Sequence, residues 1–440
     1  MVNGVGHPPN QPLSNPLPQV MMPGQMRQTA APSTSIPKPL QWCFFLFMFT
    51  LPFENMPLTF IPAGASPTKY VGLLFFGLGL LYPKVSFRYF PSILWWFIGY
   101  VAIYLISGAF IENIYYSAYK SRFITLVQLL TFFLMIYNIL RQGDLSRKIL
   151  IAFISSSVIA SLGLVFELPG FVAKTEEIVG ERTTVSGFNA NEFATVISLA
   201  TLSLIGILLD KRPKSLVYKL VLMSLSLPLM TALIYTGSRT ACLVLLLGAV
   251  LLTLPYRSSK RKMAAVVWVS LAIISAIYIT ITDPAMSSRW TLALEKGDTA
   301  GRDKIFLSSL EMFTERPLIG WGPVQLWYEL GARTGSRTRD THNLFLHLLL
   351  EVGIIGTIPF CLGLYQCYRA AWKARTGSLG LLPFALVIAV LASNMALTYL
   401  TRKPVWVMLA IAPAAAVVAS SNPKSKTRIL VRRLAMRHPL

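Results

Sequence analysis

Residues 301–323 read GRDKIFLSSLEMFTERPLIGWGP, and residues 341–356 read THNLFLHLLLEVGIIG. Both belong to the stretch from Asp283 to Gly356, which holds the one long polar passage between the apolar segments of the chain. Elsewhere the polar pieces are short, so a site that meets a water-soluble group has little room outside this stretch. We therefore expect the active site around it.

The composition is that of an integral membrane protein. Of the 440 residues, 54% are hydrophobic and 13% are charged, whereas soluble domains carry about 25% charged residues. Mean hydropathy is +0.58. The apolar runs have roughly the 20 residues that a helix needs to cross ~30 Å of hydrocarbon, and they lack the alternation of barrel strands. The sequence predicts an all-α polytopic membrane protein.

The apolar runs predict about twelve transmembrane helices and one larger extracytoplasmic loop, at 283–341. Residues 1–38 are rich in Pro, Gln, Ser and Met and are expected to form a disordered cytoplasmic tail. The helix bundle is expected over 39–420, and a basic cytoplasmic tail over 421–440. The expected spans are 40–54, 69–82, 91–110, 123–140, 149–167, 190–209, 218–236, 240–255, 263–282, 342–366, 378–399 and 404–420.

The net charge of +22 follows from membrane topology and does not indicate a nucleic-acid partner. With the amino terminus in the cytoplasm, the short inside loops and the carboxy-terminal tail hold most of the Lys and Arg, as orientation by positive charge requires. The loops at 168–189 and 283–341 then face outward. The four cysteines form no CxxC pair and no metal-ligand spacing, so we expect neither a disulfide framework nor a metal site.

Two arginines on the outer side stand against this charge pattern. Arg239, in TGSRTA, follows Gly237 at a tight turn between two spans. Arg302 follows Gly301 at the start of an expected amphipathic helix whose apolar stripe is Ile305, Phe306, Leu310 and Phe313. A helix start and a guanidinium both favour phosphate. The alternatives are an arginine reaching to lipid headgroups for Arg239 and a solvated loop charge for Arg302.

His342 and Asn343 stand at the entry to the expected span 342–366. An imidazole at the edge of the membrane can accept a proton near neutral pH, as a hydroxyl nucleophile requires. The alternative is a polar helix cap. His347 and Glu351 are four residues apart on one helical face, so we expect them to satisfy each other inside the bundle.

The earlier outward loop ends in GFNANE, at residues 187–192. Asn189, Asn191 and Glu192 could hydrogen-bond sugar hydroxyls, or they could cap the helix that begins there. Gly320 and Gly322 predict a turn. Trp321 between them is expected either to lie at the membrane interface or to stack on a sugar ring.

Together these motifs resemble the O-antigen ligase and Wzy-type O-antigen polymerase superfamily of bacterial membrane glycosyltransferases. The resemblance rests on GFNANE, TGSR, GR at a loop helix, RPLIGWG, and HN before an apolar run that ends in ExGxxG. It is strongest over residues 187–360.

The resemblance implies a metal-independent, inverting glycosyltransferase without a cofactor, in the bacterial inner membrane with both termini cytoplasmic. Its donor would be an undecaprenyl diphosphate-linked glycan, and its acceptor a glycan or a lipid. Arg239 and Arg302 would bind the diphosphate and His342 would be the general base, with Asn189, Asn191, Glu192, Asn343 and Trp321 binding substrate. Membrane lipids surround the protein, and a flippase and a chain-length regulator are the implied protein partners.

Three functions remain open on the sequence. The first is a polymerase that joins lipid-linked repeat units into exopolysaccharide, capsule or O-antigen, favoured because nothing marks a specialised acceptor. The second is a ligase that moves a finished glycan to lipid A core or to a protein. The third is a transporter of an anion or small solute, disfavoured because the chain shows no related halves.

Overall fold

The computed structural model is helical, with one short hairpin. It describes residues 35–57, 66–142, 145–176, 181–210, 215–253 and 302–421, together with isolated residues between 254 and 301. The predicted tail 1–38 lies almost wholly outside the described residues, as do the predicted span 263–282, the tail 421–440 and the first part of the loop 283–341.

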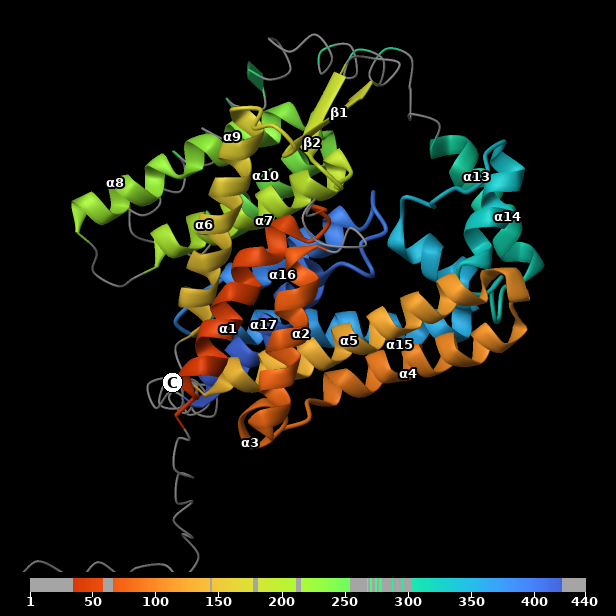
Figure 1. The fold of residues 1–440 in the computed structure, drawn as a ribbon, viewed down its shortest axis with the longest axis horizontal. Coiled ribbons are helices and arrows are strands. Elements are labelled where there is room, and N and C mark those ends of the chain that lie inside the picture. Colours follow the sequence, from red (N-terminus) through yellow and green to blue (C-terminus); the bar gives the residue numbers. More distant parts are fainter. Residues whose placement is uncertain are drawn as a thin grey trace, which may run out of the picture. The chain divides into compact units, whose positions relative to one another are not determined.

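In the first half of the chain, several helices that follow one another in sequence also pack against one another (Figure 1). Contacts between helices join α1 to α2 and α6, α4 to α5 and α15, and α6 to α7 and α9. The helices are α1 (Lys38–Thr50), η1 (Leu51–Phe53), α2 (Pro67–Leu81), α3 (Pro83–Ser86), α4 (Ser92–Ser107), η3 (Gly108–Phe110), η4 (Asn113–Tyr115), α5 (Tyr116–Arg141), α6 (Ser146–Val165), α7 (Ala190–Leu209), α8 (Leu216–Ser224), α9 (Ser226–Tyr235) and α10 (Arg239–Thr253).

Over residues 302–421, two amphipathic helices precede three apolar ones. Helix α15 packs on α4 and α17, and α16 packs on α10. The helices are α13 (Arg302–Glu315), α14 (Gln325–Thr334), α15 (Leu344–Ala374), α16 (Leu382–Ser393) and α17 (Lys403–Ser421). Every expected span within the described residues therefore contains a helix.

The polytopic membrane architecture is confirmed, but the count of twelve spans is not. Among the described residues, seven helices are long and apolar enough to cross a membrane. Three apolar helices, α2, α10 and α16, are shorter. The expected span 218–236 is one of these seven, Leu216–Tyr235; it comprises α8 and α9, which meet at Leu225 with helical φ and ψ.

A β-hairpin occupies the expected outward loop 168–189. Strands β1 (Val172–Glu176) and β2 (Glu181–Val185) pair antiparallel, with Val172 opposite Val185. The loop then turns at Gly187, whose φ is +82°, and enters α7 through Asn189.

Helix α15 is broken at Gly353, where φ is +64° and ψ is −168°. The turn at 317–322 inserts into the break. The amides of Trp321 and Gly322 donate to the carbonyls of Leu350 and Glu351, at 2.7 and 3.1 Å. In return, the amides of Ile354 and Ile355 donate to the carbonyls of Pro317 and Leu318, at 2.9 and 3.2 Å.

This exchange explains why the motifs RPLIGWG and ExGxxG occur together. A break in an apolar helix leaves backbone donors and acceptors without partners, which is costly in hydrocarbon. The turn supplies those partners, and both elements meet its geometry with glycine: Gly320 and Gly322 have φ of +71° and +91°. The predicted turn at these two glycines is confirmed.

The same insertion carries α13 and α14 onto the end of α15. A small core of Ile305, Met312, Leu326, Leu330 and Leu350 lies between the three helices. The predicted helix at Arg302 is confirmed. Of its predicted apolar stripe, Ile305 is buried and Phe313 packs against the small core, whereas Phe306 and Leu310 are exposed.

We expect Gly353→Ala to destabilise the protein by at least about 2 kcal/mol, because alanine is strained at this φ and its Cβ would collide with the carbonyl of Leu318. The measurement is the midpoint of thermal unfolding in detergent, followed by circular dichroism. Gly77→Ala in α2 is the matched control, because a Cβ there meets nothing within 4 Å. Equal midpoints for the two variants would contradict the role of the break.

Candidate functional site

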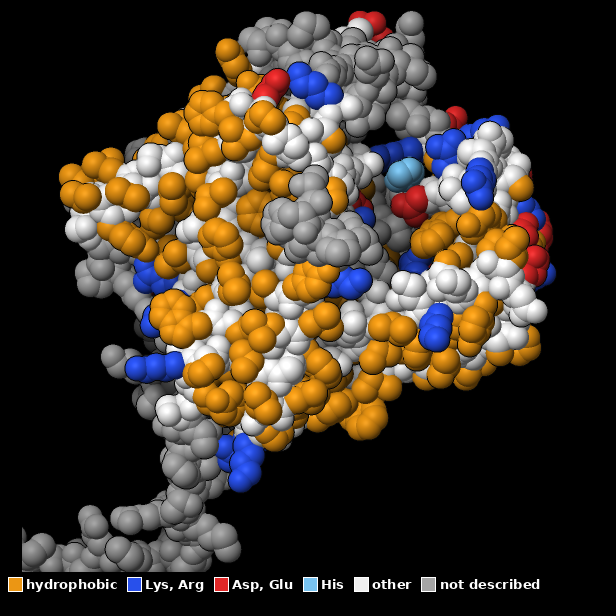
Figure 2. Space-filling model, viewed as in Figure 1, with side chains coloured by type: hydrophobic (Ala, Val, Ile, Leu, Met, Phe, Trp, Pro, Cys, Tyr) orange, Lys and Arg blue, Asp and Glu red, His pale blue; other side chains and the backbone are white. Residues whose placement is uncertain are grey.

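Three segments distant in the sequence begin at the candidate site. Arg239 is the first residue of α10 and Arg302 the first residue of α13, while His342 lies in the turn that enters α15. Figure 2 shows a hollow in which a histidine side chain lies beside basic and acidic side chains. His342 is 34% exposed, whereas His347 is fully buried.

The three predicted catalytic residues act on one another electrostatically. Burial lowers the pKa of Arg302, and the positive charge of Arg239 lowers it further. Burial also lowers the pKa of His342; Asp340 opposes this shift, and the charges of Arg302 and Arg339 add to it. The structure therefore brings Arg239, Arg302 and His342 into one electrostatically positive neighbourhood.

The turn from Arg339 to Asn343 is fixed by contacts with two other elements. The amide of Arg339 donates to the carbonyl of Trp327 at 2.9 Å, and the hydroxyls of Thr341 and Thr398 are 3.3 Å apart. At its centre His342 has a φ of +50°. A non-glycine residue in the left-handed region stores strain, and such residues cluster at functional sites.

Asp340 lies between the two described histidines. Its Oδ2 is 3.8 Å from Nδ1 of His342, and its Oδ1 is 3.7 Å from Nδ1 of His347. Burial favours the neutral acid, but contact with His347 and the positive charges that His347 and His342 can carry outweigh burial and lower the pKa of Asp340. Asp340 is therefore an anion at neutral pH.

A buried polar cluster continues from His347 into the bundle. The expected pair of His347 and Glu351 is present, with Nε2 and Oε1 3.3 Å apart. Arg122 of α5 contacts both, at 2.8 Å from His347 Nε2 and 3.3 Å from Glu351 Oε1. Tyr100 of α4 donates to Glu351 Oε2 at 2.9 Å, and the Arg122 guanidinium lies 4.5 Å from the ring centroid of Trp327.

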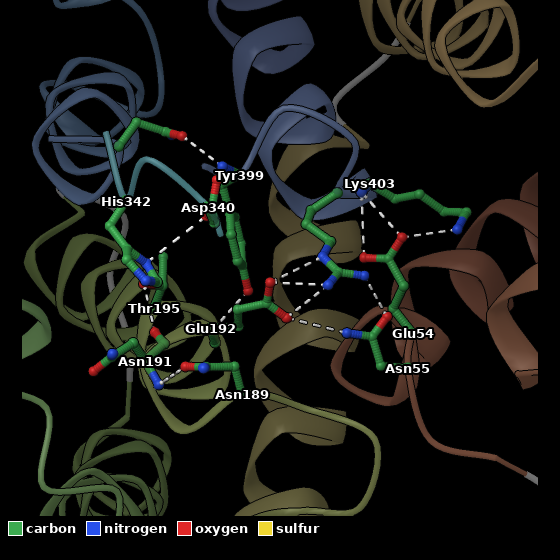
Figure 3. Close-up of polar contacts among 12 residues, drawn as sticks. Glu54, Asn55, Asn189, Asn191, Glu192, Thr195, Asp340, His342, Tyr399 and Lys403 are labelled. Atoms are coloured by element: carbon green, nitrogen blue, oxygen red, sulfur yellow. Dashed lines mark hydrogen bonds and ion pairs between the residues drawn. The ribbon is translucent and has the colours of Figure 1, made fainter. Parts of the chain in front are cut away.

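Glu192 joins three helix ends. Its carboxylate receives both hydrogen bonds of Arg402 Nη2, each 2.9 Å long, and one from Asn55 Nδ2 at 3.2 Å. The Tyr399 hydroxyl donates to its backbone carbonyl at 2.6 Å. In the view of Figure 3, Glu192 lies between the Asp340–His342 pair and the Glu54–Lys403 pair. The carboxylate is thus engaged by protein groups, and its role in substrate binding stays a prediction.

The predicted asparagines are placed at helix starts. Asn189 caps α7 by accepting from the amide of Asn191 at 2.9 Å. Asn343 caps α15 by accepting from the amides of Phe345 and Leu346, at 2.9 and 3.1 Å. The capping interpretation of Asn189 holds, and a contact of Asn189, Asn191 or Asn343 with substrate stays a prediction.

Trp321 packs between α13 and α14. Its Nε1 donates to the carbonyl of Met312 at 2.8 Å, and the guanidiniums of Arg316 and Arg333 lie 4.3 and 5.2 Å from its ring centroid. The ring therefore stabilises the segment that carries Arg302, and stacking on a sugar stays a prediction.

The sequence interpretation missed Asp340, Arg122 and Arg402. Arg122 falls one residue before the span expected at 123–140, and an arginine inside an apolar helix would have pointed to a buried acidic partner. Asp340 lies two residues before His342, the first residue of the HN motif, which could have marked it as a partner of His342. Arg402 precedes the expected span 404–420 on the outer side, so the charge pattern that marked Arg239 and Arg302 could have marked it as well.

No group of three or more His, Cys, Asp or Glu side chains in the described parts of the chain has a geometry suited to a metal ion.

We expect the Glu192–Arg402 pair to be coupled in stability. Arg402→Met leaves the partly buried Glu192 carboxylate without its cation, and Glu192→Gln leaves the Arg402 guanidinium without its anion. Each variant alone should therefore lower the unfolding midpoint in detergent. The double variant should lose less than the sum, by about 0.5–3 kcal/mol of coupling. Strictly additive losses would contradict the structural role and favour Glu192 as a free ligand for substrate.

Residues 221–361 match a family model, Wzy_C, described as O-antigen ligase. The match includes Arg239, Arg302, His342 and Glu351, whereas GFNANE lies before it. No curated protein matches the chain. The match confirms the resemblance drawn from the motifs, and it supports a glycan-processing enzyme of the membrane.

Proposed function

We propose that this chain, a member of the O-antigen ligase and Wzy superfamily, transfers a glycan from a polyprenyl diphosphate carrier to a hydroxyl acceptor. We place the reaction on the outer face of the bacterial inner membrane, with both termini cytoplasmic. The observation that carries the proposal is the convergence of Arg239, Arg302 and His342 from three distant segments.

Two guanidiniums near each other suit a diphosphate. Burial lowers the pKa of Arg302 and the like charge of Arg239 lowers it further; a bound dianion would relieve that repulsion. Each guanidinium can donate two parallel hydrogen bonds to phosphate oxygens. The same contacts stabilise the charge that grows on the diphosphate as it leaves.

In the proposed reaction, His342 accepts the proton of the acceptor hydroxyl. The hydroxyl oxygen forms a bond to C1 of the donor sugar, and the bond from C1 to the diphosphate oxygen breaks. The bonding electrons leave with the polyprenyl diphosphate, and His342 later releases its proton to water. A single displacement of this kind inverts the anomeric centre, and diphosphate departure assisted by Arg239 and Arg302 requires no metal.

The acceptor separates two versions of the function. A polymerase would extend a lipid-linked repeat unit, which needs no specialised acceptor site. A ligase would move a finished glycan to lipid A core or to a protein, and the description of the matched family model fits this version at least as well. Both versions use the same donor chemistry.

The deciding experiment compares a deletion strain complemented with wild type or with His342→Ala, at equal protein level in the membrane. We expect His342→Ala to abolish normal output, because acid–base catalysis contributes on the order of 10²–10⁴ in rate. Lipid-linked and surface glycans are resolved by size. Accumulated single repeat units indicate a polymerase, long chains left on the carrier indicate a ligase, and an unchanged profile would refute the proposal and favour the transporter.

We expect Arg239→Lys to reduce the rate on the order of 10²-fold, because an ammonium keeps the charge but cannot make the paired contact. The assay is polyprenyl diphosphate release by the purified protein. Arg337→Lys is the matched control, since Arg337 lies exposed in the same polar region. Equal rates for Arg239→Lys and the control would count against diphosphate binding by Arg239.

The pH dependence follows from the environment of His342. Burial lowers its pKa below the ordinary 6.5, so the neutral imidazole, which is the active base, persists as pH falls through that value. We expect kcat/KM to stay level from neutral pH to below 6.5 and then to fall as His342 takes up a proton. If the fall of kcat/KM on the acidic side were centred above pH 6.5, it would contradict this environment of His342.

A further inference from the structure

We propose that Asp340 is a positioning residue that fixes the proton of His342, and that a buried polar cluster, formed by Tyr100, Arg122, Glu351 and His347, holds Asp340 in turn. The inference deepens the proposed function, because it rests on His342 acting as the base. Its first support is geometric. Each oxygen of Asp340 faces one imidazole, at 3.8 Å from Nδ1 of His342 and 3.7 Å from Nδ1 of His347.

The cluster can be given a direction, starting from Arg122. A guanidinium can only donate hydrogen bonds, and Arg122 Nη2 lies 2.8 Å from His347 Nε2. The Nε2 atom is therefore the acceptor, and the proton of the His347 ring sits on Nδ1. That atom faces Asp340, so His347 donates towards the carboxylate.

Arg122 has a second contact through the same nitrogen. Its Nη2 forms an ion pair with Glu351 Oε1 at 3.3 Å, while Tyr100 donates to the other oxygen of Glu351 at 2.9 Å. His347 Nε2 and Glu351 Oε1, which are 3.3 Å apart, thus both lie beside one cationic group. Among the described residues, Arg122 Nε, His347 Nδ1 and Asp340 Oδ1 are buried without a hydrogen-bond partner, and the last two face each other at 3.7 Å.

The burial of this cluster argues for a function. Arg122 is 9% exposed, and Glu351 and His347 are fully buried. Charged side chains inside a membrane helix cost free energy, and they are usually retained where they serve a site. The charges of Arg122 and Glu351 offset each other, so the cluster presents to Asp340 one oriented donor, Nδ1 of His347.

The consequence for His342 concerns its tautomer. A carboxylate only accepts hydrogen bonds, so Asp340 favours the His342 ring with the proton on Nδ1. The lone pair is then on Nε2, the nitrogen that does not face Asp340. At 3.8 Å the pair is a charge contact, and a shift of under about 1 Å would make it a hydrogen bond, as often occurs when a catalytic site binds its substrate.

The test is Asp340→Asn in the full-length protein, purified in detergent. The probe is the lipid-linked glycan extracted from a strain that lacks the enzyme, and the readout is polyprenyl diphosphate release. We expect kcat/KM to fall on the order of 10²-fold, as for a misplaced catalytic group. The charged groups that act on His342 are Asp340, Arg302 and Arg339. Because Asp340 is the one anion among them, Asp340→Asn should lower the pKa of His342 and move the acidic fall of kcat/KM, its acidic limb, to lower pH.

Two further variants keep the inference falsifiable. Asp340→Glu retains the carboxylate and should recover a large part of the rate and the original acidic limb. Glu311→Gln, an exposed acid on α13, should change neither. Unfolding midpoints of all variants show whether any loss of rate follows a loss of fold.

The outcomes separate this inference from the proposed function. If His342→Ala abolishes release but Asp340→Asn leaves the rate and the acidic limb unchanged, the positioning role is wrong and the proposed function stands. A lower rate with an unmoved limb, or no recovery with Asp340→Glu, also overturns the positioning role. If His342→Ala retains the wild-type rate, the proposed function itself is wrong.

Discussion

The structure depends on the backbone hydrogen bonds that close the break in α15. At Gly353 the helix cannot satisfy its own carbonyls and amides, and the turn at 317–322 satisfies them. This exchange carries α13, and with it Arg302, to the entrance of α15 where His342 lies. It also sets Glu351, two residues before the break, among Arg122, His347 and Tyr100. One backbone exchange therefore positions both the polar site and the buried cluster behind it.

Rules that act over a few residues predicted much of the molecule. Apolar run length located the helices, and asparagine before an apolar run marked the starts of α7 and α15. Arg239, Arg302 and His342 were found because each stood out against the topology or at a helix start. Their convergence was expected only from the family resemblance, because it depends on how α10, α13 and α15 lie in space, which the residues alone do not give.

The errors have physical reasons as well. Only part of the apolar stripe predicted on α13 is buried, because in a membrane protein an apolar residue such as Phe306 or Leu310 is as stable facing lipid as facing the core. Gly353 could not be singled out, since glycine is common in membrane helices and does not by itself break them. Asp340 was one charge among many in a polar passage, and only the fold shows that it lies between His342 and His347.

The turn inserted at Gly353 also constrains how the protein is made. The turn precedes α15 in the chain, so it emerges first, but the carbonyls and amides that receive it belong to a helix that must first enter the bilayer. The four backbone hydrogen bonds between them can form only after α15 is in place. The entrance to the site is thus assembled late in biogenesis, and an enzyme whose chain ends before α15 would hold Arg239 and Arg302 without the geometry that joins them.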